Sequence, residues 1–257
     1  MDPHTHLDAL TEGVPRLREV LADGDLAAPV SGCPGWTLAD LGAHVGSIYR
    51  FARTGLVERR GLDVKEPGPT EREPMLAWFD EGADALLAAL RSIDARDGWD
   101  APAWTMAPPA TAAFWARRQH HETALHLWDA LESQGADPAA AAALALADDS
   151  AADGIDEIVR MFFPRQVRLG RLAPLQDSLG VIAGPVSLVI GGDGTGDPHL
   201  DSRSHAVASE APDAVLAGPP AAVLLALWKR IPLDSPGLTI TGDLAAASRV
   251  VSAALTP

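Results

Sequence analysis

The chain has 257 residues, 47% of them hydrophobic, and a formal charge of −15 at pH 7, so it can bury a core in one large domain or two modest ones. The negative charge repels phosphate backbones and anionic lipid surfaces, which argues against nucleic acid or a membrane as partner. No leader-like segment is visible, and the longest apolar run, 221–228, is far short of the roughly 18 residues of a membrane span. We therefore expect a cytoplasmic protein.

Apolar residues recur at three- and four-residue steps through the first two thirds of the chain, which is typical of amphipathic helices. Thr37 and Asp40 form a capping-box pattern at the start of the second of these stretches. The spacing predicts helices over 6–21, 38–51, 74–91, 112–133 and 138–163. Amphipathic helices of this length joined by loops predict a helical bundle.

Short β-branched runs appear beyond Phe163-Pro164, each bounded by Gly, Pro or Asp. These runs predict strands at 181–182, 186–190 and 238–241, and helical spacing returns over 219–230 and 243–254. The expected fold class is therefore α+β, with a helical bundle over residues 1–165 and a small α+β domain over residues 166–257.

Glu122 and His126 are four residues apart within the helix expected over 112–133, so their side chains share one helix face. A carboxylate and an imidazole need a third donor, for which His44 is the candidate, to make a tetrahedral shell with one open position. The alternative is an exposed glutamate beside an ordinary helix histidine. His120 and His121 are other possible donors, but at helical spacing they point away from that face, and we expect them to face solvent or to support the ligands.

Arg118 and Asp129 each lie within about one turn of this pair on the same helix face. A cation can hold a ligating carboxylate, and a carboxylate can accept the free ring N–H of a ligating histidine. We therefore predict that Arg118 contributes to cofactor binding and that Asp129 supports His126; a surface ion pair is the alternative for both. Cys33 is the only cysteine, which excludes an intrachain disulfide, and we interpret it as a packed residue.

Two stretches, taken together, resemble the mycothiol-dependent maleylpyruvate isomerase family, whose members are DinB-like metal-binding bundles with a sterol-carrier-like C-terminal domain. The first is Cys33-Pro34-Gly35-Trp36-Thr37-Leu38-Ala39-Asp40-Leu41-Gly42-Ala43-His44, and the second is Trp115-x-x-Arg118-x-x-His121-Glu122-x-x-x-His126-x-x-Asp129. The stretch from Ala214 to Asp243 also looks like that family's second domain, so the resemblance covers nearly the whole chain.

The resemblance implies a divalent metal, usually zinc, held by His44, Glu122 and His126, with mycothiol as cosubstrate. It also implies that Arg230 matches a basic position that could bind a carboxylate of substrate or thiol; a helix C-terminal charge is the alternative. The expected partners are a small electrophilic molecule and a low-molecular-weight thiol, and the expected activity is cis–trans isomerisation or thiol S-transfer. A non-catalytic metal-binding or ligand-binding module and a thiol-independent metal-dependent hydrolase are the alternatives.

Overall fold

The computed structural model describes residues 1–61, 66–195 and 211–257. It divides into two compact units, Met1–Leu146 and Ala147–Pro257, which together make a mixed α+β chain with a helical N-terminal part. The expected fold class is therefore confirmed. The division lies before residue 165, where the change from helical spacing to short β-branched runs predicts the boundary.

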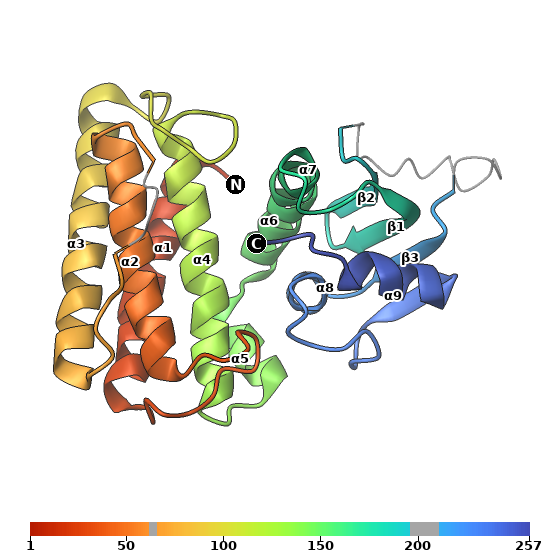
Figure 1. Ribbon diagram of the computed structural model, residues 1–257, viewed down its shortest axis with the longest axis horizontal. Coiled ribbons are helices and arrows are strands. Elements are labelled where there is room, and N and C mark those ends of the chain that lie inside the picture. The colour runs from red at the N-terminus through yellow and green to blue at the C-terminus, as the bar shows by residue number, and fades with distance from the viewer. Residues whose placement is uncertain (62–65, 196–210) are drawn as a thin grey trace. The chain divides into compact units, whose positions relative to one another are not determined.

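The first unit is a four-helix bundle with one short additional helix. Its long helices are α1 (Pro3–Asp23), α2 (Leu38–Val57), α3 (Arg72–Asp97) and α4 (Ala112–Ser133), shown side by side in Figure 1. Helices α1 and α2 each pack against both α3 and α4, and α5 (Pro138–Ala145) packs against α4. All four long helices lie where the apolar spacing predicts them.

Helices α2 and α3 run in the same direction, because Gly42 faces Met75 and, one turn later, Gly46 faces Phe79. The connection between the two helices must therefore return along the length of the bundle. Gly46 allows this close approach, since a Cβ there would collide with the Trp78 ring.

Side-chain caps fix the first residues of two helices, α1 and α2. Thr37 accepts a hydrogen bond from the Asp40 N–H, and Asp40 accepts one from the Thr37 N–H, which confirms the capping box. Asp2 caps α1 by accepting bonds from the N–H groups of His4 and Thr5. The first cap holds the 24–37 loop against the end of α2 that carries His44.

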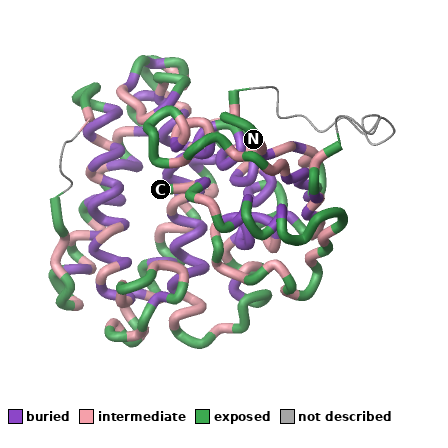
Figure 2. The backbone as a smooth tube through the Cα atoms, turned by 45° about the vertical axis from the view of Figure 1, so that its right-hand side comes forward, coloured by how far each residue is buried: buried purple, intermediate pink, exposed green. Residues whose placement is uncertain are grey.

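Large apolar side chains from all four helices meet along the bundle axis, and Figure 2 shows the buried stripe on each helix. Helix α4 buries more polar side chains than any other described helix of the bundle, including the charged or titratable Arg118, His126 and Asp129. Burying charged groups is costly unless they are paired, so α4 is where a functional site is expected. The largest side chains of the bundle core with under 2% exposure are Leu10, Leu17, Leu21, Leu38, Leu41, Tyr49, Met75, Phe79, Leu86, Trp115 and Trp128.

The prediction of a single helix over 138–163 is wrong. The chain instead forms α5, then α6 (Asp148–Glu157), one π-helical turn (η1, Ile158–Phe162) and α7 (Phe163–Arg168). The break occurs because Leu146 and Ala147 adopt non-helical backbone angles. Beyond it, α6 packs against α8 and β2, so its apolar face contributes to the core of the second unit. This packing is the reason the units divide at residue 146.

The second unit contains a sheet of order β2-β1-β3-β4 among the described residues. Its strands are β1 (Leu175–Ala183), β2 (Val186–Gly192), β3 (Ala214–Ala217) and β4 (Thr239–Gly242); β1 and β3 are parallel and the other pairs antiparallel. Helix α9 (Leu244–Ser252) packs on β1 and β3, and α8 (Pro220–Leu227) packs against α6. Strand β3 was not expected, since four residues with two alanines carry a weak strand signal.

Across the part of the chain that the structure describes, no helix combines the length and the hydropathy needed to cross a membrane.

Candidate metal centre

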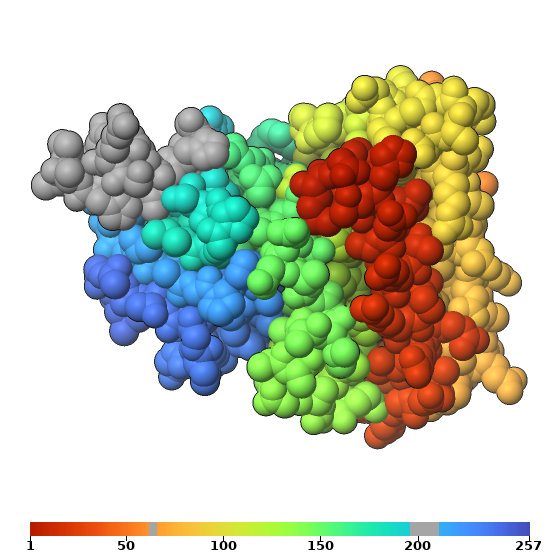
Figure 3. Space-filling model, turned by 180° about the vertical axis from the view of Figure 1, so that it is seen from behind, coloured from red at the N-terminus to blue at the C-terminus, as the bar shows by residue number. Residues whose placement is uncertain are grey.

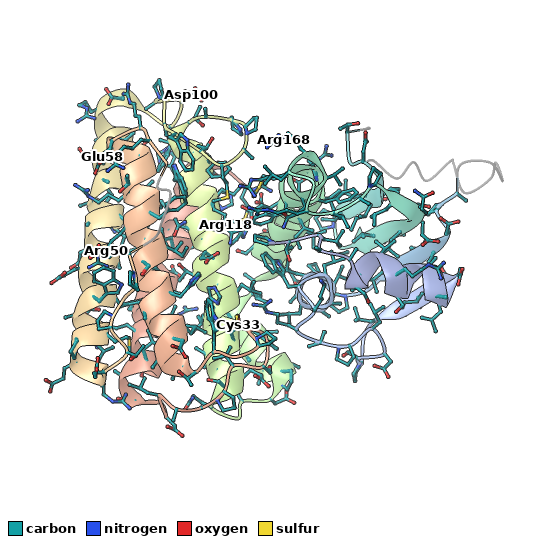
Figure 4. The ribbon with its side chains drawn as sticks, in the orientation of Figure 1. Cys33, Arg50, Glu58, Asp100, Arg118 and Arg168 are labelled. Carbon is teal, nitrogen blue, oxygen red and sulfur yellow. The ribbon has the colours of Figure 1, made fainter. Side chains whose placement is uncertain are left out.

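Four polar side chains occupy one face of α4 at steps of four, four and three residues: Arg118, Glu122, His126 and Asp129. This spacing stacks them along the helix axis, so each side chain reaches its neighbour. Figure 4 labels Arg118 on α4 and Cys33, which comes from the loop before α2, near the lower end of the same helix. The site is therefore built on one rigid helix and completed by the segment that surrounds the start of α2.

His44 comes from α2 and meets the α4 pair directly. Its Nε2 lies 3.1 Å from Glu122 Oε1, and His126 Nε2 lies 3.3 Å from the same oxygen. The structure thus brings together the three residues that the sequence suggested as one donor set. Their side chains are 24%, 16% and 8% exposed for His44, Glu122 and His126 respectively, so the set is accessible from the His44 side and covered on the His126 side.

Both supporting residues are buried and oriented toward the donors. Arg118 Nη2 donates to Glu122 Oε2 at 2.7 Å, which leaves Oε1 directed at the two histidines. His126 Nδ1 lies 3.0 Å from Asp129 Oδ2, and Asp129 has no exposed surface. These buried contacts exclude the surface-ion-pair alternative for both residues. An Nδ1–H held by a carboxylate leaves the Nε2 lone pair for a ligand.

The protonation of Glu122 and of His126 depends on the buried groups around them. Burial by itself raises the pKa of Glu122, but hydrogen bonds from His126 and His44 and the charge of Arg118 outweigh it and hold that pKa well below its ordinary value. Burial likewise lowers the pKa of His126, whereas its hydrogen bonds with Asp129, Cys33 and Glu122 raise it well above the ordinary value. These contacts stabilise a proton on the His126 ring, so a metal at Nε2 would compete with that proton.

The residues present fit a divalent transition metal. Two imidazoles and one carboxylate are donors that zinc accepts, and metal–ligand bonds of 2.0–2.2 Å in a tetrahedron separate neighbouring donor atoms by about 3.3 Å. The two separations from Glu122 Oε1, 3.1 and 3.3 Å, match this value, and all three donor atoms lie within 4.8 Å of one another. Three protein donors leave one position for water or a substrate atom, which is the pattern of catalytic rather than structural zinc.

Two residues that the sequence reasoning did not place in the site lie beside it. The Trp36 ring packs on His44 at a centroid distance of 4.6 Å and lies nearly parallel to the His126 ring at 6.3 Å. Cys33 Sγ is 3.8 Å from Asp129 Oδ2, so the thiol borders the site instead of only filling the core. The sequence feature that could have identified them is their position in the loop just before the capped start of α2, the helix that carries His44.

Three other expected positions have different outcomes. His120 and His121 do not face solvent: both are buried, and they group with His6 from α1. Arg230 lies in the second unit just beyond α8, where its N–H bonds to the Leu225 carbonyl and its guanidinium to the Trp228 carbonyl. Its guanidinium therefore meets the carbonyl end of α8, and a role with substrate stays a prediction.

Comparisons with known proteins place the chain in a family. The family model described as "Mycothiol maleylpyruvate isomerase N-terminal domain" matches residues 7–131, and that described as "MDMPI C-terminal domain" matches residues 149–249. No curated protein matches the chain.

Two solved structures have the same fold over nearly the whole chain. One is a crystal structure of mycothiol-dependent maleylpyruvate isomerase, with 16% identity, a TM-score of 0.59 and 95% coverage of both chains. The other is a histidine-to-alanine mutant of mycothiol-dependent maleylpyruvate isomerase, with 17% identity, the same TM-score and the same coverage. Because the two family domains occur in order and together span most of the sequence, the chain belongs to the mycothiol-dependent maleylpyruvate isomerase family.

Proposed function

We propose that the protein is a mycothiol-dependent cis–trans isomerase that uses a divalent metal, zinc by the chemistry of its donors, held by His44, Glu122 and His126. One observation carries the proposal: in a chain of this family, two imidazole nitrogens lie 3.1 and 3.3 Å from one carboxylate oxygen, the spacing of donor atoms around a single metal ion. The substrate class follows from the family name, since maleylpyruvate contains a cis double bond conjugated to carbonyl groups.

When bound, the metal supplies a coordination position at which a thiol, whose ordinary pKa is about 8.5, is deprotonated at neutral pH. The protein residues supply the rest. Arg118 fixes the orientation of Glu122, and Asp129 fixes the ring of His126. The half-buried Trp36 covers the two histidines on one side, which limits the approach of water from that direction.

The reaction is balanced without an oxidant or a reductant. The thiolate sulfur bonds to one alkene carbon, and the π electrons move onto the conjugated carbonyl oxygen. Rotation about the resulting single bond follows, after which the electrons return, the C–S bond breaks and the thiolate leaves. Arg118 enters this scheme through its bond to Glu122, and Arg230 is proposed to bind a carboxylate of the substrate or of the thiol.

The test is an isomerisation assay with maleylpyruvate, followed by ultraviolet absorbance, with and without mycothiol. Wild type and two variants are compared, Glu122→Gln in the donor set and Glu132→Gln as the control. Glu132 lies on the same helix, bonds to Ser31 and is not part of the donor set. We expect thiol-dependent turnover in wild type and in the control. Glu122→Gln should lose at least about 100-fold, because removing a ligand costs no less than removing a supporting partner.

Other outcomes would overturn the proposal in distinct ways. Accumulation of a stable thioether would assign S-transfer in place of isomerisation, and turnover without thiol would assign hydrolysis. Calorimetry that detects no binding of mycothiol to the zinc-loaded protein would favour a non-catalytic metal-binding module.

A further inference from the structure

Three buried histidines form a second cluster within the bundle. His6 from α1 faces His120 and His121 from α4, and the three side chains can each direct a nitrogen so that all lie within 4.8 Å of one another. The Nδ1 atoms of His6 and His120 are 2.9 Å apart. All three residues are less than 9% exposed.

The histidine cluster is separate from the Glu122 site although both use α4. His120 precedes Glu122 by two residues, which places the two side chains about 160° apart around the helix. His121 is about 100° from Glu122 by the same geometry. No residue is common to the two donor sets among the described residues. The histidine cluster therefore lies between α4 and α1, whereas the Glu122 site lies between α4 and α2.

We propose that His6, His120 and His121 bind a second divalent transition-metal ion, of the zinc class, that links α1 to α4. Imidazole suits zinc, copper and nickel, and a set of three histidines is an established zinc shell. A tetrahedral ion needs nitrogen separations of about 3.3 Å. The observed range, from 2.9 Å to at most 4.8 Å, brackets that value, so small side-chain rotations suffice.

The contact between His6 and His120 indicates what the ion replaces. Two imidazole nitrogens 2.9 Å apart are joined by one proton, since one must donate and the other accept. An ion at this position takes the lone pair of both nitrogens and releases that proton. The His120 and His121 rings are 4.8 Å apart at 30°, so the adjacent pair presents two rings toward α1, where His6 completes the set.

The ion has a route to this buried position. His6 is the fourth residue of α1, and Figure 3 shows the N-terminal end of the chain at the surface of the first unit. Helix ends open locally at much lower free energy than global unfolding. Opening only the first turn of α1, which holds His6, exposes that histidine while Leu10 and Leu17 stay packed in the bundle core. Once bound, the ion holds that turn against α4.

The test is zinc stoichiometry on tag-free protein by mass spectrometry and by competition with a chromophoric chelator. Wild type should bind about two equivalents, one per three-donor set. His126→Ala and His6→Ala should each bind about one, and the double variant none. His4→Ala is the matched control, since this histidine is on the same turn of α1 but contacts Trp99 and Asp94 instead of the cluster.

A second measurement, of thermal stability, distinguishes loss of the site from misfolding of the variants. In the His126→Ala background, added zinc should raise the melting temperature with increasing zinc concentration, because only the folded state holds the three-histidine site. Adding His6→Ala should abolish that rise, while His4→Ala should keep it. If saturated wild type binds a single equivalent that His126→Ala removes, the cluster is only a hydrogen-bonded group and the proposal fails, whereas the Glu122 site stands.

Discussion

If His126 is a metal ligand as proposed, the carboxylate of Asp129 should control metal affinity through its contact with the His126 ring. Asp129 is fully buried and holds His126 Nδ1 at 3.0 Å. Partners of this kind contribute about 10- to 100-fold to metal affinity, or about 1.4–2.7 kcal/mol. Asp129→Asn keeps an acceptor for the Nδ1–H but loses the charge, so we expect a loss of about tenfold. Asp129→Leu removes both, and we expect a loss of about 100-fold.

The assay is zinc competition against a chromophoric chelator at pH 7 in the His6→Ala background, which isolates the Glu122 site from the histidine cluster. Glu132→Gln removes one negative charge from α4 three residues further along and should leave the affinity unchanged. Circular dichroism of the metal-free variants verifies that α4 is intact. Asp129→Leu with wild-type affinity, or an equal loss in Glu132→Gln, would refute the role assigned to Asp129.

Three further predictions concern stability. Leu17 is fully buried in α1, so Leu17→Ala should lower the free energy of unfolding by about 2–5 kcal/mol in a urea titration. Lys229 has a φ of +60°, and Lys229→Gly should stabilise the second unit by about 1 kcal/mol in the same titration, since glycine avoids the left-handed penalty. Bonds from the side chain and N–H of Thr5 lower the pKa of Asp2 from 3.8 to about 2. The stabilisation from ionised Asp2 is thus complete above pH 4 and disappears towards pH 2, so the melting-temperature difference between wild type and Asp2→Ala should shrink over that range.

Each of these has its own control. Leu144 is 58% exposed on α5, and Leu144→Ala should change stability by less than about 0.5 kcal/mol; a cost equal to that of Leu17→Ala would contradict the core assignment. Lys229→Ala keeps a side chain at the left-handed position, so stabilisation there would show that strain is not the cause. Asp2→Asn retains a capping oxygen but cannot titrate, and it should melt like Asp2→Ala only if the carboxylate charge provides the stabilisation.

Helices are the part of this protein that its sequence predicts best. The long helices, the Thr37 capping box and the shared face of Glu122 and His126 all follow from residues within a few positions of one another. The same local reasoning fails at residues 146–147, because the Ala-rich stretch has strong helix propensity and the break depends on α6 packing into the second unit. Strand β3 was missed for the same reason, since its pairing with β1 and β4 specifies it more than its composition does.

The sequence by itself determined the fold class, the two-part organisation and a carboxylate–imidazole pair on one helix face, because hydrophobic periodicity and helical spacing are local properties of the chain. Only the tertiary structure decided what surrounds that pair. It placed Arg118 and Asp129 in buried contacts with Glu122 and His126, brought Trp36 over the histidines, and turned His120 and His121 inward toward His6. The physical reason is that helix direction and packing partner depend on contacts between residues far apart in the chain, and these contacts decide which polar side chains on α4 are buried together.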